Sequence, residues 1–197
     1  MQELSRKTKH FTDSVIRRMT RIAIANNAIN LAQGFPDFDP PKVLTDRLEE
    51  ISQLGPHQYP ITMGAPNFRR ALAEKCGRFM GRKIDPETEV VVTIGSTEAM
   101  VDTLFAITNP GDKIIMFSPY FENYRAQTLL VDCEPIFVPL IPPAFNYDAN
   151  VLEDAFKQGA KAILICNPSN PSGKVFTEAE LKQIADLAIK YDTYVIM

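Results

Sequence analysis

Three stretches of this sequence place polar or aromatic side chains directly after an apolar run, where they could contact a ligand. In VVVTIGSTEAM, Gly95, Ser96 and Thr97 lead into a helical pattern, and the unpaired N–H groups and dipole of a helix start favour an anion. In FSPYFENY, Phe121 lies among further aromatic residues. In CNPSNPSGKVF, proline restricts the backbone before it, so Asn170 is held extended with its amide projecting. The chemistry on offer is anion binding, ring stacking and hydrogen bonding by a fixed amide.

Each stretch taken alone also has a plainer interpretation. A Gly-Ser turn before a helix is often only an N-cap, aromatic residues often only pack a loop, and an Asn-Pro loop is usually only a turn. Together, the three groups suit a flat, phosphorylated, aromatic cofactor, and pyridoxal phosphate is such a molecule. The stretch around Gly95 is neither a P-loop nor a GxGxxG motif, which argues against nucleoside triphosphates and dinucleotides.

The elements that must position these groups alternate regularly along the second half of the chain. The apolar runs are hydrophobic throughout, which predicts a mostly parallel sheet covered on both faces. The fold class is therefore α/β, doubly wound, and ligands bind such sheets at the carboxyl ends of the strands. We expect strands at 90–94, 113–117, 135–140, 162–166 and 194–197, and helices at 97–108, 121–131, 149–157 and 178–191.

Two local signals refine this prediction. The prolines at 135 and 139 cannot donate to a ladder on both sides, so the strand that carries them is expected at an edge of the sheet. The sequence TEAE predicts a capping box between Thr177 and Glu180 at the start of the last helix.

The first 80 residues are predicted to be mainly helical. An arginine-rich helix with an apolar face follows a cap at Asp13 or Ser14, although an organellar transit peptide is an alternative. A second helix is predicted to start with Asp39 as its cap and to close at Gly55, and a third runs through FRRALAEKCGRFMGRK. The chain stops at YVIM inside a predicted strand, so we expect a fragment of a longer protein.

Composition excludes several classes of function. The 197 residues are 45% hydrophobic with a net charge of −3, which is ordinary for a globular protein and gives no electrostatic footprint for nucleic acid. Three scattered cysteines and two histidines form neither a disulfide framework nor a zinc site. No apolar run is long enough to span a membrane, so we expect a cytoplasmic protein without a metal, nucleic-acid or membrane partner.

The sequence resembles a known family over nearly its whole length. The residues that carry the resemblance are SVIRRMTRIA, AINLAQGFPDFDPP, QYPITMGAPNFRRALA, VVVTIGSTEAM, GDKIIMFSPYFENY and ICNPSNPSGKVFT. In this order they are similar to the N-terminal portion of a class I, fold-type I, pyridoxal-phosphate-dependent aminotransferase, most closely of the kynurenine and methionine aminotransferase branch. The resemblance implies an N-terminal arm and part of the small domain at residues 1–41. Residues 42–197 then form an incomplete cofactor-binding large domain.

The resemblance also implies roles for the three stretches. Ser96 and Thr97, with Gly95 shaping the turn, correspond to the residues that hold the cofactor phosphate. Phe121 corresponds to the aromatic residue stacked on the pyridine ring. Asn170 matches the asparagine that hydrogen-bonds the cofactor's phenolic oxygen.

Two further residues and a missing one follow from the resemblance. Tyr59 matches a tyrosine that reaches the phosphate of the neighbouring subunit, which implies a homodimer. Gly34 matches a residue whose backbone lines the site of the substrate carboxylate. No lysine of this chain matches the family's Schiff-base lysine, which is expected after Met197, so no catalytic residue is assigned and the chain alone is expected to be inactive.

The implied activity is amino-group transfer between an L-amino acid and a 2-oxo acid, in amino acid metabolism. Two alternatives stay open. One is a β-lyase that uses pyridoxal phosphate on the same scaffold, and the other is a truncated paralogue that binds without catalysing a reaction.

Overall fold

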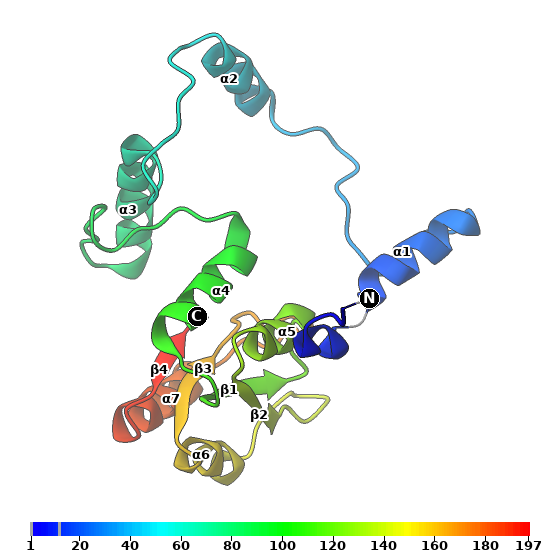
Figure 1. Cartoon of the computed structure of the whole chain (residues 1–197), viewed down its shortest axis with the longest axis vertical. Coiled ribbons are helices and arrows are strands. Elements are labelled where there is room, and N and C mark those ends of the chain that lie inside the picture. The colour runs from blue at the N-terminus through cyan, green and yellow to red at the C-terminus, as the bar shows by residue number, and fades with distance from the viewer. Residues whose placement is uncertain (1, 12) are drawn as a thin grey trace. The chain divides into compact units, whose positions relative to one another are not determined.

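The computed structural model describes residues 2–11 and 13–197, which form two compact units. The first unit combines the residues up to Ser14 with residues 96–197, and the second runs from Val15 to Gly95. Figure 1 labels the elements of both. Each unit is described by itself below.

A four-stranded parallel sheet forms the centre of the first unit. Its order is β2-β1-β3-β4, and every neighbouring pair is parallel. The predicted parallel α/β fold is therefore confirmed, and so is the edge position of the proline-bearing strand, β2. The strands are β1 (Lys113–Ser118), β2 (Glu134–Pro139), β3 (Ala160–Leu164) and β4 (Tyr194–Ile196).

Helices and apolar clusters lie on both faces of this sheet. The alternation of strand side chains sends Ile115 and Phe117 into one buried cluster and Ile114 and Met116 into another. The first cluster includes residues of α6 and α7, and the second includes Leu104 of α4. The sheet is thus covered as a doubly wound fold requires. The helices are α4 (Gly95–Ile107), α5 (Glu122–Leu130), α6 (Ala149–Lys157) and α7 (Glu178–Lys190).

The N-terminal segment of the first unit packs against α5. It forms the 3-10 helix η1 (Arg6–His10). Lys7 donates to the Leu130 carbonyl at 2.7 Å and pairs with Asp132 at 2.6 Å. The Ser14 hydroxyl donates to the Glu122 carboxylate at 2.6 Å, so both ends of α5 are tied to this segment.

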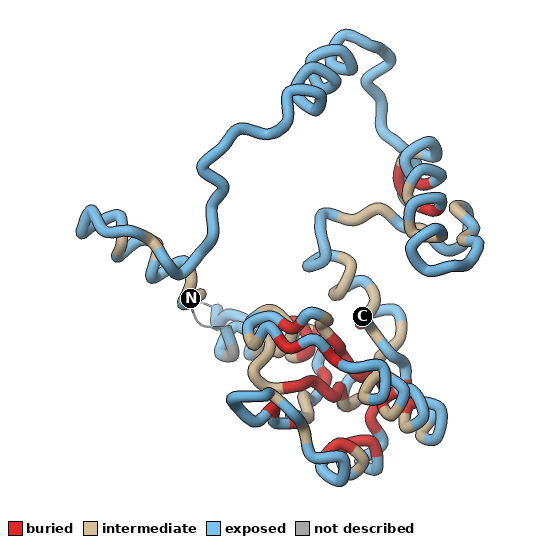
Figure 2. Tube along the Cα trace, turned by 180° about the vertical axis from the view of Figure 1, so that it is seen from behind, coloured by how far each residue is buried: buried red, intermediate tan, exposed pale blue. Residues whose placement is uncertain are grey.

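The second unit contains three helices with very different burial. α1 (Val15–Ala25) and α2 (Lys42–Ser52) contain no buried residue, whereas α3 (Pro66–Met80) buries Arg69 and Ala73, as Figure 2 shows by colour. The predicted cap at Asp39 is wrong, because α2 begins at Lys42 with Pro41 as its N-cap.

The expected strand at 90–94 does not form. The segment has no strand assignment, and Val91 and Ile94 are 59% and 88% exposed. Its backbone hydrogen bonds include one from the Val92 N–H to the Met63 carbonyl at 3.0 Å and one from the Gly95 N–H to the Thr93 carbonyl at 2.9 Å. A strand requires a neighbour for its N–H and C=O groups, and the second unit contains no strand that could supply one.

Arg69 organises the residues around this segment. Its guanidinium donates to the carbonyls of Gly64 at 3.2 Å and Pro86 at 2.5 Å, and to the Glu87 carboxylate at 2.9 Å. Gly64 has a φ of +102°, and a Cβ there would overlap the Val92 side chain, so only glycine fits.

None of the helices of the described residues reaches both the length and the hydrophobicity of a membrane span.

Candidate functional site

The first turn of α4 carries the predicted anion site. Gly95 adopts a φ of +71°, which lets the chain turn sharply into the helix. Ser96 and Thr97 follow in that first turn, and both are exposed. The N–H groups of a first helical turn have no partner within the helix, so this turn offers backbone and hydroxyl donors to an anion.

The N-terminal part of α5 lies beside this turn. The Asn123 Nδ2 atom donates to the Thr97 hydroxyl oxygen at 3.2 Å, and the Gln127 Nε2 atom donates to the Thr97 carbonyl at 2.8 Å. Phe121 is the N-cap residue of α5, and its ring meets that of Tyr124 edge-on, with centroids 5.6 Å apart. The candidate ring-stacking residue therefore immediately precedes the helix that contacts the candidate phosphate turn.

The loop after β3 uses its two asparagines differently. The Asn167 side-chain oxygen accepts the Phe176 N–H at 3.0 Å, so Asn167 holds the loop together. Two backbone bonds close the loop around it, from Ser169 N–H to the Lys174 carbonyl and from Gly173 N–H to the Ser169 carbonyl. Asn170 is exposed, and within the described residues its amide makes no hydrogen bond. Its side chain is thus available to a ligand.

The aromatic loop and the asparagine loop meet at one edge of the sheet. A small hollow at the carboxyl ends of β1 and β3 is lined by Tyr120, Tyr124, Cys166 and Asn170, among others. Burial, together with a hydrogen bond to Cys166 and the charge of that residue, raises the pKa of the Tyr124 hydroxyl to about 12. Tyr124 therefore keeps its proton at neutral pH. Tyr120 stacks on Phe137 with centroids 5.2 Å apart, which fits the plainer packing interpretation for that residue.

A buried ion pair holds the asparagine loop against α7. The Lys174 side chain is 6% exposed, and its Nζ atom lies 2.8 Å from the Glu180 carboxylate. The same ammonium lies 3.4 Å from the Asn146 side-chain oxygen and faces the Phe176 ring. Glu180 also forms the predicted capping box with Thr177, which is confirmed. The pair therefore joins the loop that carries Asn170 to the start of a helix.

Replacing Glu180 by glutamine tests this ion pair. At neutral pH we expect the free energy of unfolding to fall by about 2 kcal/mol, because the buried Lys174 ammonium loses its charged partner. Glutamine can still complete the capping box, so the helix start is kept. The measurement is chemical denaturation of the full-length gene product, with Glu178→Gln as a control that removes an exposed charge from the same turn.

The effect of Glu180→Gln should depend on pH. Burial alone would raise the pKa of Glu180, but hydrogen bonds from Lys174 and Thr177 outweigh it and hold the pKa below its ordinary value of 4.5. Stability from a lowered carboxyl pKa is complete above the ordinary value and is lost as the pH falls through the folded value. The difference between wild type and variant should therefore shrink below pH 4.5. A difference that stays constant down to pH 3 would contradict this account.

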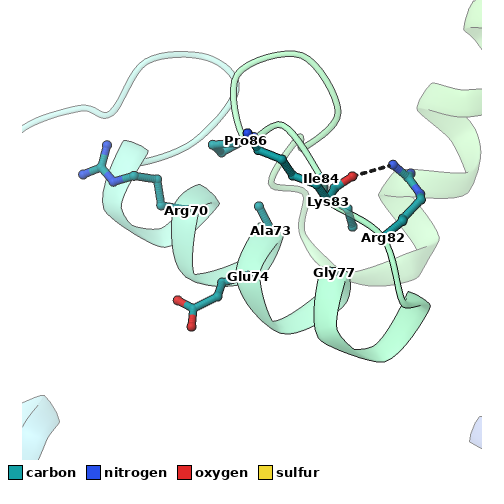
Figure 3. A pocket seen from close by; sticks show the side chains of 8 residues that line it. All are labelled: Arg70, Ala73, Glu74, Gly77, Arg82, Lys83, Ile84 and Pro86. Atoms are coloured by element: carbon teal, nitrogen blue, oxygen red, sulfur yellow. Dashed lines mark hydrogen bonds between the residues drawn. The ribbon is translucent and has the colours of Figure 1, made fainter.

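A larger hollow lies elsewhere, in the second unit. Figure 3 shows it between α3 and residues 82–86, where the Arg82 guanidinium donates to the Lys83 carbonyl at 3.1 Å. None of the predicted site residues lines it.

Tyr59 and Gly34 also belong to the second unit and are exposed, Tyr59 to 98%. Their predicted roles stay predictions.

The first-unit residues fit the chemistry of pyridoxal phosphate. Helix N–H groups with the Ser96 and Thr97 hydroxyls suit a phosphate, the Phe121 ring suits the face of a pyridine, and the Asn170 amide suits a phenolic oxygen. One further observation agrees: the Gln127 side-chain oxygen, beside the phosphate turn, is buried without a hydrogen-bond partner among the described residues. Polar groups buried at such a cost are typical of functional sites.

Comparison with known proteins identifies the family. Residues 26–197 match the family described as Aminotransferase class I and II, and the chain belongs to that family. The class I and II aminotransferases depend on pyridoxal phosphate, which confirms the predicted family and cofactor. Solved aminotransferase structures likewise confirm the fold-type I architecture.

Two relatives and one solved structure illustrate the similarity. The Mycobacterium tuberculosis protein named Probable N-succinyldiaminopimelate aminotransferase DapC is 35% identical over 96% of this chain and 48% of its own length. Mouse kynurenine–oxoglutarate transaminase 3 is 32% identical over 90% of this chain and 41% of its own. The structure of YbdL from Escherichia coli, whose description gives a methionine aminotransferase function, matches with a TM-score of 0.92, 28% identity, and coverage of 99% and 51%. The chain thus spans about half the length of the curated relatives it matches.

Sequence reasoning missed the residues that support the site. Asn123 and Gln127 are one helical turn apart on α5, which is the sequence signal for a shared face. Only the structure places that face against Thr97.

Proposed function

We propose that the full-length protein transfers an amino group between an L-amino acid and a 2-oxo acid with pyridoxal phosphate as cofactor. One observation carries the proposal: in a chain of this family, the aromatic loop and the exposed Asn170 meet at the edge where α/β sheets bind ligands, and α5, which follows the aromatic loop, contacts the turn at Ser96 and Thr97. The relatives named for kynurenine, methionine and N-succinyldiaminopimelate support the reaction class but differ in substrate.

Each of the predicted site residues has a part in binding. Ser96 and Thr97 donate hydrogen bonds to the cofactor phosphate, with Gly95 shaping the turn, and Phe121 covers one face of the ring. The Asn170 Nδ2 atom donates to the phenolic oxygen and keeps that oxygen free of its proton. When bound, the cofactor acts as an electron sink for the bond broken at the substrate Cα.

The remaining assignments belong to the same proposal. Gly34 lines the substrate carboxylate site, and Tyr59 reaches the phosphate of a neighbouring subunit in a cytoplasmic homodimer. Residues 1–41 form the arm and part of the small domain. The family's lysine and its proton transfer lie outside residues 1–197. A monomer in sedimentation equilibrium would contradict the dimer and the role of Tyr59.

The experiment is a transfer assay with the purified full-length gene product. We expect amino transfer from kynurenine, methionine or an acidic amino acid to a 2-oxo acid, dependent on added pyridoxal phosphate. A cysteine conjugate as substrate distinguishes the β-lyase alternative, because elimination releases pyruvate and ammonia without consuming a 2-oxo acid. Cofactor binding without turnover on any of these substrates would favour the non-catalytic alternative.

A further inference from the structure

We infer that α5 sets the phosphate end of the cofactor site, with Asn123 and Gln127 acting as positioning residues that orient Thr97. The inference rests on the proposed function, because it assumes that the first turn of α4 holds the cofactor phosphate. Asn123 contacts the Thr97 hydroxyl and Gln127 contacts the Thr97 carbonyl, so a single residue of the turn is held from two sides.

The bond from Asn123 determines what the Thr97 hydroxyl can do. An amide nitrogen is a donor only, so the hydroxyl oxygen accepts and its own hydrogen stays available for an anion. Other threonines of this region behave differently. Thr103 and Thr108 donate their hydroxyl hydrogens to the carbonyls of Ala99 and Leu104, four residues earlier, at 2.7 and 2.6 Å. Thr97 is thus prepared as a donor toward the outside of the helix.

The polar group of the Gln127 side chain adds little to the stability of the fold. The residue is 6% exposed, its nitrogen donates to the Thr97 carbonyl, and its oxygen has no hydrogen-bond partner among the described residues. In a regular helix the Thr97 carbonyl also accepts the N–H four residues later, so it does not depend on Gln127. An apolar side chain of the same length would avoid the unpaired oxygen. The amide therefore serves to hold the turn rather than to stabilise the core.

Helix α5 also fixes the spacing within the site. Phe121 is the N-cap of α5, and Asn123 and Gln127 follow on the same helix. The ring-stacking residue and the two residues that brace the phosphate turn therefore move as one rigid element. This arrangement sets the distance between the ring contact and the phosphate contact.

The test uses the full-length gene product freed of pyridoxal phosphate, with the variants Gln127→Met and Asn123→Asp. The matched control is Asn150→Asp, which places the same new charge at an exposed position in the first turn of α6. Three quantities are measured: the thermal midpoint of the cofactor-free protein, the dissociation constant of pyridoxal phosphate, and the pKa of the bound phosphate by phosphorus NMR.

For Gln127→Met we expect an unchanged or higher thermal midpoint together with about tenfold weaker cofactor binding. For Asn123→Asp we expect at least about tenfold weaker binding and a raised phosphate pKa, because the new carboxylate takes the Thr97 hydrogen and repels the phosphate. The control should match wild type in all three. Wild-type affinity and phosphate pKa in both variants would overturn the inference while leaving the proposed function intact. Failure of the wild-type protein to bind the cofactor would overturn the proposed function itself.

Discussion

Replacing Asn170 by alanine in the full-length gene product is expected to lower kcat/KM for amino transfer by about 100-fold. The exposed amide is the group of this loop that is available to a ligand, and an N–H donor stabilises an oxygen that has lost its proton. Without it, the pH midpoint of the bound cofactor's visible absorption change should move upward. Steady-state kinetics and a spectroscopic pH titration measure the two effects.

The other asparagine of the loop supplies the control. The Asn167 side-chain oxygen accepts a hydrogen bond from the Phe176 N–H, so Asn167→Ala should lower the thermal midpoint. It should leave the absorption midpoint of the folded, cofactor-loaded protein near that of wild type. The assignment of Asn170 fails if Asn170→Ala keeps wild-type kinetics and absorption while the cofactor is bound.

Replacing Arg69 by methionine is expected to have the largest effect on stability. The buried guanidinium is the shared donor to the Gly64 carbonyl, the Pro86 carbonyl and the Glu87 carboxylate. Methionine fills much of the space but leaves two carbonyls without this donor, so we expect a loss of about 3 kcal/mol. Hydrogen exchange of the full-length gene product should speed up across residues 63–92 and stay slow in β1.

Its neighbour provides a matched comparison. Arg70 follows Arg69 in the same turn of α3 but is exposed, so Arg70→Met should change stability by less than about 0.5 kcal/mol. Equal effects of the two substitutions would show that Arg69 does not organise this region.

The parts of the fold that follow from local chemistry were predictable. Uninterrupted apolar runs indicated buried parallel strands, the prolines at 135 and 139 indicated an edge, and TEAE indicated a capping box. The prediction of a strand at 90–94 was wrong, although the residues there are as apolar as those of β1. Hydrophobicity reports a tendency to be buried, but a strand also needs a neighbour, and the sequence of the segment does not say whether one is present.

The candidate site likewise has features that were predictable from the sequence and features that were not. Phe121 and Asn170 follow the runs that form β1 and β3, and neighbouring parallel strands bring such positions to one edge. Ser96 and Thr97 follow a run that forms no strand, and contacts from α5 hold their turn instead. The contacts of Thr97 with Asn123 and Gln127 were not predictable, because they join residues 26 and 30 positions apart in the sequence. The capping role of Glu180 was predicted, but its buried pairing with Lys174 was not, because a lysine in a polar loop resembles an ordinary surface charge.

The central claim is amino transfer, and a single-turnover reaction tests it most directly. The full-length gene product loaded with pyridoxal phosphate is mixed with a reactive amino acid alone, and the 2-oxo acid formed is counted against the bound cofactor. The account predicts one equivalent of 2-oxo acid per site, retention of the amino group by the protein, and further turnover only when a 2-oxo acid acceptor is added. Many equivalents with free ammonia and no acceptor, or no 2-oxo acid at all, would contradict it.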